Sequence, residues 1–195
     1  MKIYHLPLIS FLKKDFGFFR TRETFEQIKN YLSGIKIIDI GCGTGHLSKI
    51  LKDKGYEVTA IDVKNKNQFL DINFSLYDGQ SIPSENLKYD TALLMTVLHH
   101  TKDPDKIIFE ALRVAKRVII IEDIYNSKLE KYKTFLLDSI FNFEFFTHPH
   151  TNKTDSGWKE YFSNKNIKLL QADYWITKTP IGNIRQALYC IERNG

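Results

Sequence analysis

The sequence predicts an α/β fold in which helices cover both faces of a mostly parallel β-sheet, a doubly wound sandwich. Short apolar stretches rich in β-branched residues alternate with segments whose apolar residues recur at helical spacing. The last two strand-like stretches follow one another without a helix between them, which indicates a closing antiparallel pair. Because parallel crossovers are right-handed, the alternating part winds into a single sheet with ligands at its carboxyl edge.

The predicted strands differ in how strongly the sequence marks them. The runs IKIIDI and RVIII are continuous and apolar, as in strands buried on both faces, whereas the third strand is weakly patterned. The strands are predicted at 35–40, 57–61, 72–77, 89–95 and 117–121, followed by the pair 167–176 and 184–192.

The helices are predicted from apolar spacing and from their end signals. Asp103 followed by Pro104 is an N-cap residue followed by a proline at the first helical position. Gly34 and Gly55 are expected to end the two helices that precede them. The helices are predicted at 21–33, 45–54, 104–116, 127–141 and 157–164.

Composition limits the classes of protein that the chain can represent. The 195 residues are 43% hydrophobic and 26% charged, as in a globular domain, and the net charge of +5 comes from scattered Lys and Arg residues. We therefore find no clear nucleic-acid signal. The two cysteines provide neither a disulfide framework nor zinc spacing, so we expect a cytoplasmic protein without a structural metal. With no spanning apolar run and no signal peptide evident, we expect no membrane partner.

The stretch DIGCGTGHL at 39–47 carries the main functional signal. Gly41, Gly43 and Gly45 follow a predicted strand and precede a predicted helix, where bare backbone lets a ligand approach closely. A dinucleotide fingerprint requires a third glycine at the position that His46 occupies, and a P-loop requires Gly-Lys-Ser/Thr. The pattern fits neither motif, and Asp39 stands two residues before the first glycine.

This stretch resembles motif I of the class I S-adenosylmethionine (SAM)-dependent methyltransferases. The resemblance continues through AIDV (60–63), YDGQSIP (77–83), YDTALLMTVLHH (89–100) and IIIED (119–123). It implies one Rossmann-like domain, 1–195, with a seven-stranded, mostly parallel sheet whose last strand is antiparallel. Within it we expect an N-terminal helical cap (1–34), a SAM-binding core (35–125) and an acceptor-side, sheet-closing part (126–195).

The resemblance also implies how the methionine end of SAM is held. Asp39 resembles the family acid that holds the methionine ammonium group through water. Gly41, Gly43 and Gly45 would bring backbone against the methionine and the ribose, and Thr96 would line the methionine end with its backbone.

The residues that would bind the nucleoside end of SAM lie in two later stretches of the sequence. Asp62 would accept both ribose hydroxyls, with a solvated turn acid as the alternative. Val63 would pack on the adenine. Asp78 resembles the residue that accepts from the adenine amino group, with the Gly79 N–H near the ring, although Asp-Gly is also a common turn.

The catalytic residues are less marked. His99 and His100 follow the fourth strand, where one of them could be a general base, but packing and loop hydrogen bonds are favoured for both. The segment His148-Pro149-His150 is interpreted as a loop over the acceptor rather than a metal site. Glu122 and Asp123 could touch a polar acceptor or only cap the next segment.

The function predicted from the sequence is methyl transfer from SAM to an acceptor, leaving S-adenosyl-L-homocysteine (SAH). A small-molecule acceptor is favoured because no additional nucleic-acid-binding module is evident. The alternatives are a nucleic-acid or protein methyltransferase, and an inactive SAM-binding sensor or partner subunit. The aromatic stretches 11–20 and 140–150 are expected to close over the site or to pack in the core.

Overall fold

The computed structural model describes residues 21–128, 130–132, 152–179 and 182–194. Seven strands form one sheet in the order β3-β2-β1-β4-β5-β7-β6. The strands are β1 Lys36–Ile40, β2 Glu57–Asp62, β3 Asn73–Leu76, β4 Tyr89–Met95, β5 Ala115–Ile124, β6 Ile167–Thr179 and β7 Gly182–Arg193. The helices are α2 His46–Asp53, α3 Pro104–Val114 and α5 Asp155–Asn164, with a short 3-10 helix η1 at Leu98–His100 and a helical segment at 21–28.

The direction of the strands confirms the predicted mixed sheet. The first five strands pair in parallel, and β7 runs antiparallel to both β5 and β6. The chain builds outward from β1 to β3 and then returns to place β4 on the other side of β1. The order therefore reverses between β1 and β4, which is where open α/β sheets bind their ligands.

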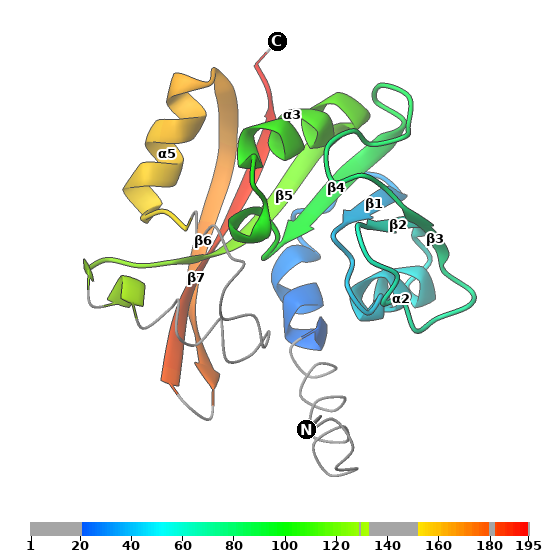
Figure 1. Cartoon of the computed structure of the whole chain (residues 1–195), viewed down its shortest axis with the longest axis horizontal. Helices are drawn as coiled ribbons and strands as arrows, with labels where there is room; N and C mark the ends of the chain where they lie inside the picture. Colours follow the sequence, from blue (N-terminus) through cyan, green and yellow to red (C-terminus); the bar gives the residue numbers. More distant parts are fainter. Residues whose placement is uncertain (1–20, 129, 133–151, 180–181, 195) are drawn as a thin grey trace.

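Two apolar cores lie on opposite faces of the sheet (Figure 1). On one face α3 and α5 pack on the sheet, with Trp158 and Phe162 of α5 fully buried. On the other face the segment 21–28 and α2 cover it through Phe25, Ile28 and Leu51. Because side chains alternate along each strand, Ile37 and Ile38 of β1 enter different cores.

The ends of several elements differ from the prediction. The first helix is helical over 21–28 rather than 21–33 and is followed by turns, so Gly34 does not end it. Strand β5 reaches Ile124 instead of ending at 121, since its pairing with β7 continues through Ile124 and Arg185. Of the helix predicted at 127–141, residues 128 and 130–132 are helical and 133–141 lie outside the described residues.

The predicted cap of α3 is present in the structure. The Asp103 side chain accepts a hydrogen bond from the Lys106 backbone N–H, and Pro104 occupies the first turn. Helix α2 begins differently, because Gly45 has a φ of 80° at its N-cap and offers no side chain there. The glycine turn therefore leads directly into the amino end of α2.

Candidate functional site

A cavity of about 840 Å³ opens at the carboxyl ends of β2, β1, β4 and β5, beside the amino end of the antiparallel strand β7. It crosses the point between β1 and β4 where the strand order reverses. Nine residues that the sequence singled out for the site line it: Gly41, Gly43, Asp62, Val63, Asp78, Gly79, Thr96, His100 and Asp123. Asp39, Gly45 and His99 are predicted site residues that do not line this cavity.

The glycine turn shows why side chains are excluded from it. Gly41, Gly43 and Gly45 all have positive φ values, of 73°, 55° and 80°. A Cβ atom on Gly41 would lie 2.7 Å from a methyl group of Val97, whereas one on Gly43 would enter open space. Gly43 is thus the position where bare backbone faces the cavity, and Gly41 permits close packing inside the protein.

Hydrogen bonds to the Asp62 side chain link the glycine turn to the end of β2. One carboxylate oxygen accepts the Gly43 N–H at 2.8 Å, and the other accepts the Lys64 N–H at 3.0 Å. A carboxylate has about four acceptor sites, so each oxygen retains the capacity to accept one more hydrogen bond. The carboxylate of Asp62 therefore lies beside the exposed backbone of Gly43, ready to receive two donors from a ligand.

Asp39 lies behind the turn rather than on the cavity wall. Its side chain is 2% exposed and accepts a hydrogen bond from the Ser48 hydroxyl at 2.6 Å. Burial, partly offset by the Ser48 hydroxyl, raises the pKa of Asp39 from 3.8 to about 6, and the nearby Asp62 carboxylate adds to the rise. Any contact between Asp39 and a ligand ammonium group would accordingly run through a bridging water.

The segments after β2 and β3 form one part of the cavity wall. Val63 is 54% exposed although it is apolar, and it lines the cavity. One oxygen of Asp78 accepts the backbone N–H groups of Gln80 and Ser81, both at 2.7 Å, and these bonds lower the pKa of Asp78. Asp78 therefore stabilises a turn, the alternative that the sequence left open, and it also lines the cavity.

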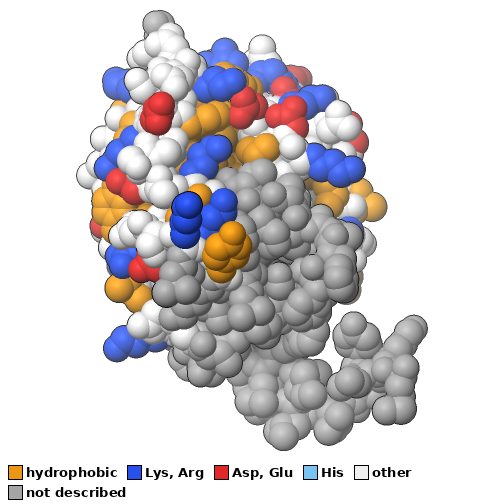
Figure 2. Space-filling view, turned by 60° about the vertical axis from the view of Figure 1, so that its left-hand side comes forward, with side chains coloured by type: hydrophobic (Ala, Val, Ile, Leu, Met, Phe, Trp, Pro, Cys, Tyr) orange, Lys and Arg blue, Asp and Glu red, His pale blue; other side chains and the backbone are white. Residues whose placement is uncertain are grey.

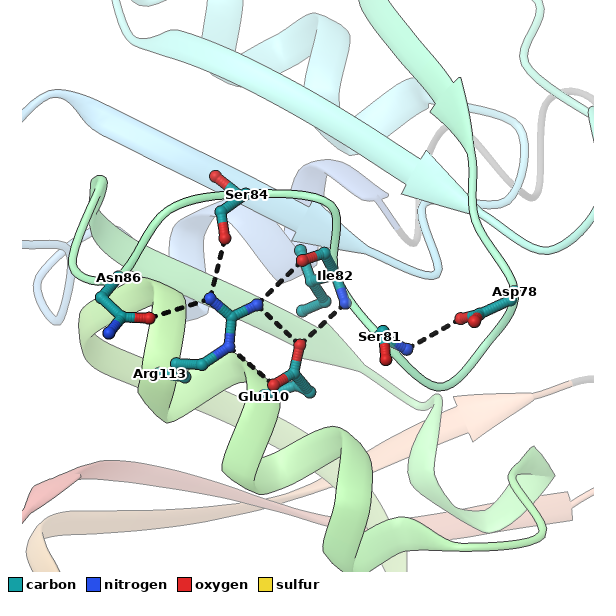
Figure 3. Close-up of polar contacts among 7 residues, drawn as sticks. All are labelled: Asp78, Ser81, Ile82, Ser84, Asn86, Glu110 and Arg113. Atoms are coloured by element: carbon teal, nitrogen blue, oxygen red, sulfur yellow. Dashed lines mark hydrogen bonds and ion pairs between the residues drawn. The ribbon is translucent and has the colours of Figure 1, made fainter.

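Helix α3 fixes the loop that carries Asp78 and Gly79 (Figure 3). The Arg113 guanidinium donates to the backbone carbonyls of Ile82 and Ser84, both at 2.8 Å, and forms two 2.7 Å bonds with Glu110. Glu110 in turn accepts the Ile82 N–H at 2.8 Å. A planar guanidinium that satisfies several acceptors at once holds this loop in one conformation. No sequence motif marks this pair of residues.

Thr96 lines the cavity directly after β4. It has a φ of 56°, in the left-handed region that non-glycine residues rarely adopt. Its backbone N–H donates to the Ile121 carbonyl at 2.7 Å and its hydroxyl donates to the Met95 carbonyl. Strained backbone of this kind is frequent in functional sites.

The two histidines have different environments. His99 is 1% exposed, and its Nδ1 lies 2.5 Å from a carboxylate oxygen of Glu122. The other oxygen of Glu122 accepts the Leu98 N–H at 2.7 Å. This pair fixes the turn after β4, which favours packing for His99, as the sequence analysis preferred. His100 reaches the cavity wall. No sequence signal paired Glu122 with His99.

Several cavity residues were missed because no motif carries them. Tyr77 lines the cavity, and burial raises its pKa to about 12. Four lysines also line it, namely Lys64, Lys66, Lys102 and Lys106, together with Asp103, which the sequence marked only as the cap of α3. They lie just after strands or at the start of α3, and this position in the sequence is the one signal that could have indicated a place at the cavity.

A smaller cavity of about 50 Å³ adjoins the first at Met95 and Thr96. It is lined further by Glu23 and Gln27 of the helical segment 21–28 and by Gln186 of β7. Polar side chains of the segment 21–28 therefore lie next to the end of β4, beside the larger cavity.

Metal sites and membrane-spanning helices are both absent from the described residues. His, Cys, Asp and Glu side chains there do not gather in any group of three or more that could hold a metal ion. Within the same ranges, every helix falls short of the length and apolar character needed to cross a bilayer. The segment His148–His150 lies outside the described residues.

A mostly parallel sheet with a glycine turn and a strand-end carboxylate facing one cavity is an arrangement in which α/β domains commonly bind nucleoside-containing ligands. A family model described as a methyltransferase domain matches residues 12–171. The chain belongs to this family, the class I SAM-dependent methyltransferases.

Curated relatives agree with this assignment. An uncharacterized methyltransferase of Staphylococcus carnosus is 30% identical over 146 residues, which are 68% of this chain and 66% of that protein. A ubiquinone biosynthesis O-methyltransferase of Bordetella avium is 29% identical over 97 residues, 44% of this chain and 40% of that protein. The chain therefore matches less than two thirds of the length of these relatives.

Solved structures share the fold. A SAM-dependent methyltransferase of Methanosarcina mazei has a TM-score of 0.67 at 24% identity, covering 85% of this chain and 96% of that one. The magnesium protoporphyrin IX methyltransferase of Synechocystis PCC 6803, solved with bound SAH, has a TM-score of 0.63 at 16% identity, with coverages of 91% and 84%. The likeness confirms the predicted Rossmann-like, seven-stranded sheet.

Proposed function

We propose that this protein transfers a methyl group from SAM to a small-molecule acceptor and leaves SAH. The observation that carries the proposal is the open backbone of Gly43 beside the carboxylate of Asp62. Any side chain at Gly43 would occupy space that a ligand could otherwise use. The carboxylate of Asp62 offers acceptor oxygens to the two hydroxyls of a ribose. The residues present therefore fit an adenosine-containing cofactor.

The remaining contacts follow the shape of the cavity. Val63 would pack on the adenine, and the Asp78-Gly79 turn would receive its amino edge. Gly41 and Thr96 would bring backbone to the methionine end, with Asp39 balancing its ammonium group through water. When bound, SAM supplies an electrophilic methyl group on a sulfonium, with a neutral thioether as the leaving group.

The protein's own contribution would be to align the acceptor with the methyl group and to exclude water from the reaction. Holding two reactants in line accelerates such a displacement strongly without any other catalytic group. The cavity extends past Thr96 toward Asp123 and Ile184, which leaves room for an acceptor beyond the cofactor.

A small-molecule acceptor is supported by two observations. The curated relatives include O-methyltransferases of ubiquinone biosynthesis. Lysines and aspartates occur equally on the cavity wall, and on the face shown in Figure 2 basic and acidic side chains are interspersed. A nucleic-acid partner would favour a basic stripe. Since Cys42 and Cys190 are both free thiols, we also propose a reducing compartment such as the cytosol.

Calorimetric titration with SAM, SAH and NAD tests the proposal. We expect micromolar binding of both sulfur ligands and no binding of NAD. Asp62→Ala should weaken SAH binding about 100-fold, because two hydrogen bonds to a charged group are lost. Asp53→Ala is the matched control, since Asp53 lies at the end of α2 and outside the cavity. Absence of SAM and SAH binding would refute the proposal, and binding without methylation of any acceptor would favour a sensor or partner subunit.

A further inference from the structure

Asp123 of β5 is a buried acid on the acceptor side of the cavity. Its side chain is 5% exposed, yet it lines the cavity together with Ile184 of β7. Asp62 lies at the end of β2, on the other side of the reversal between β1 and β4. If the cofactor occupies the Asp62 side, Asp123 lies on the side that remains for the acceptor.

The side chain of Gln186 fixes the orientation of Asp123. The Gln186 amide nitrogen donates to one Asp123 carboxylate oxygen at 2.7 Å. The Gln186 oxygen accepts from the Trp175 indole N–H at 3.1 Å and from the Thr177 hydroxyl at 2.6 Å. An indole N–H can only donate, so the amide oxygen must face Trp175 and the NH₂ group must face Asp123.

The backbone of Asp123 is fixed as well. Its carbonyl accepts from the side-chain amide of Asn152 at 3.1 Å. Residues from β6, β7 and the segment before α5 therefore hold this one aspartate. An acid held by rigid surrounding residues is suited to act on a bound molecule at a defined place.

The contact with Gln186 needs an acceptor atom but no charge. Burying a carboxylate is costly, so a buried acid on the wall of a cavity is a candidate for a role in binding or chemistry.

We infer that Asp123 binds the acceptor through an O–H or N–H group and takes its proton as the methyl group is transferred. This inference rests on the proposed function. As the bond from the acceptor oxygen or nitrogen to the methyl carbon forms, the carbon–sulfur bond breaks and its electron pair stays on sulfur. The proton of the acceptor passes to the Asp123 carboxylate and then to water. Thioether acceptors, which have no proton to lose, are outside the class of substrate.

The test compares the wild type with Asp123→Asn, using catechol and benzylamine as probes. SAH-loaded protein measures equilibrium binding of each probe, and SAM-loaded protein measures turnover. We expect Asp123→Asn to bind SAH within about 3-fold of the wild type, to bind the probe about 10-fold more weakly and to turn over about 100-fold more slowly. Asp173→Asn removes the same charge from exposed β6 outside the cavity and should change none of these values.

Two further measurements separate a catalytic role from a structural one. The wild-type kcat should rise with pH as a carboxylate ionises, and Asp123→Asn should lose that rise. Asp123→Glu keeps the carboxylate but moves it by one methylene, so it should recover part of the turnover together with the pH dependence. This second variant also keeps the inference testable if Asp123→Asn folds poorly.

Each outcome is decisive. Unchanged probe binding and turnover in Asp123→Asn, or loss of SAH binding along with turnover, would overturn the inference. SAH-loaded wild type that binds neither probe would overturn it too. Wild type that binds no SAH would instead refute the proposed function, and the inference with it.

Discussion

Replacing Asp39 by asparagine should make the ligand-free protein more stable at neutral pH. Asp39 is buried behind the glycine turn, and burial raises its pKa from 3.8 to about 6. Asparagine has nearly the same shape, and its oxygen can still accept the Ser48 hydroxyl that now binds Asp39. The substitution removes the cost of a buried negative charge and keeps the hydrogen bond.

The size of the effect follows from the two pKa values. Between pH 3.8 and 6 the folded state binds the Asp39 proton more tightly than the unfolded state, so ionisation lowers stability as pH rises through this range. At 1.36 kcal/mol for each pH unit, the difference amounts to about 3 kcal/mol above pH 6 and roughly half of that at pH 5. Below pH 3.8 both forms are neutral and the two proteins should have equal stability.

Urea denaturation of the ligand-free proteins at pH 5 and pH 7.5 measures this difference. Asp39→Asn should gain more free energy of unfolding at pH 7.5 than at pH 5. Asp90→Asn should instead lose free energy of unfolding at pH 7.5. Lys116 and two backbone N–H groups lower the pKa of Asp90 and stabilise its charged form, which the substitution removes. A loss of stability in Asp39→Asn that is the same at both pH values would refute the reasoning. Calorimetry should also show weaker SAM binding, since the variant cannot balance an ammonium group.

Other predictions concern the turn, the histidine pair and the loop held by α3. Gly43→Ala and Gly55→Ala should each cost about 1–2 kcal/mol of stability for a side chain at positive φ, but only Gly43→Ala should lose SAH binding in calorimetry. Equal SAH binding by both would contradict the open position at Gly43. Glu122→Ala leaves a buried histidine without its carboxylate and should lower the free energy of unfolding by about 3–5 kcal/mol, whereas Glu192→Ala, in a half-buried ion pair, should change it by about 1 kcal/mol or less. Arg113→Lys should weaken SAH binding about tenfold by loosening the loop, and unchanged affinity would show that other contacts hold it.

The sequence predicted the sheet well because the relevant signals are local. Strands β1, β2 and β4 appear as apolar runs that end at polar residues, and their observed ends differ from the prediction by one residue at most. The length of β5 was underestimated because Glu122 and Asp123 are polar, and polarity was taken to mark the end of a strand. Their burial depends on partners far along the chain, which no local pattern contains.

Part of the site could also be predicted from local sequence, and part could not. The stretch that contains Gly43 and Asp62 could be found from spacing, and the structure brings both to the cavity. The pairing of Glu122 with His99, and of Gln186 with Asp123, joins residues 23 and 63 positions apart in the chain. Such contacts depend on the tertiary arrangement of β4, β5 and β7 and not on local periodicity.

The cavity takes its two ends from different parts of the chain. The end near Asp62 is built from consecutive segments, since β1, β2 and the loop after β3 all lie between residues 36 and 79. The end near Asp123 and Ile184 is assembled from β5 and β7, which enter the sheet separately. If the acceptor binds at the second end, as proposed, substrate preference should change with a few positions of β5 and β7 while the stretch 36–79 is left intact. A library randomised at Ile184 and its neighbours on β7 would vary what is methylated without rebuilding the methyl-donor site.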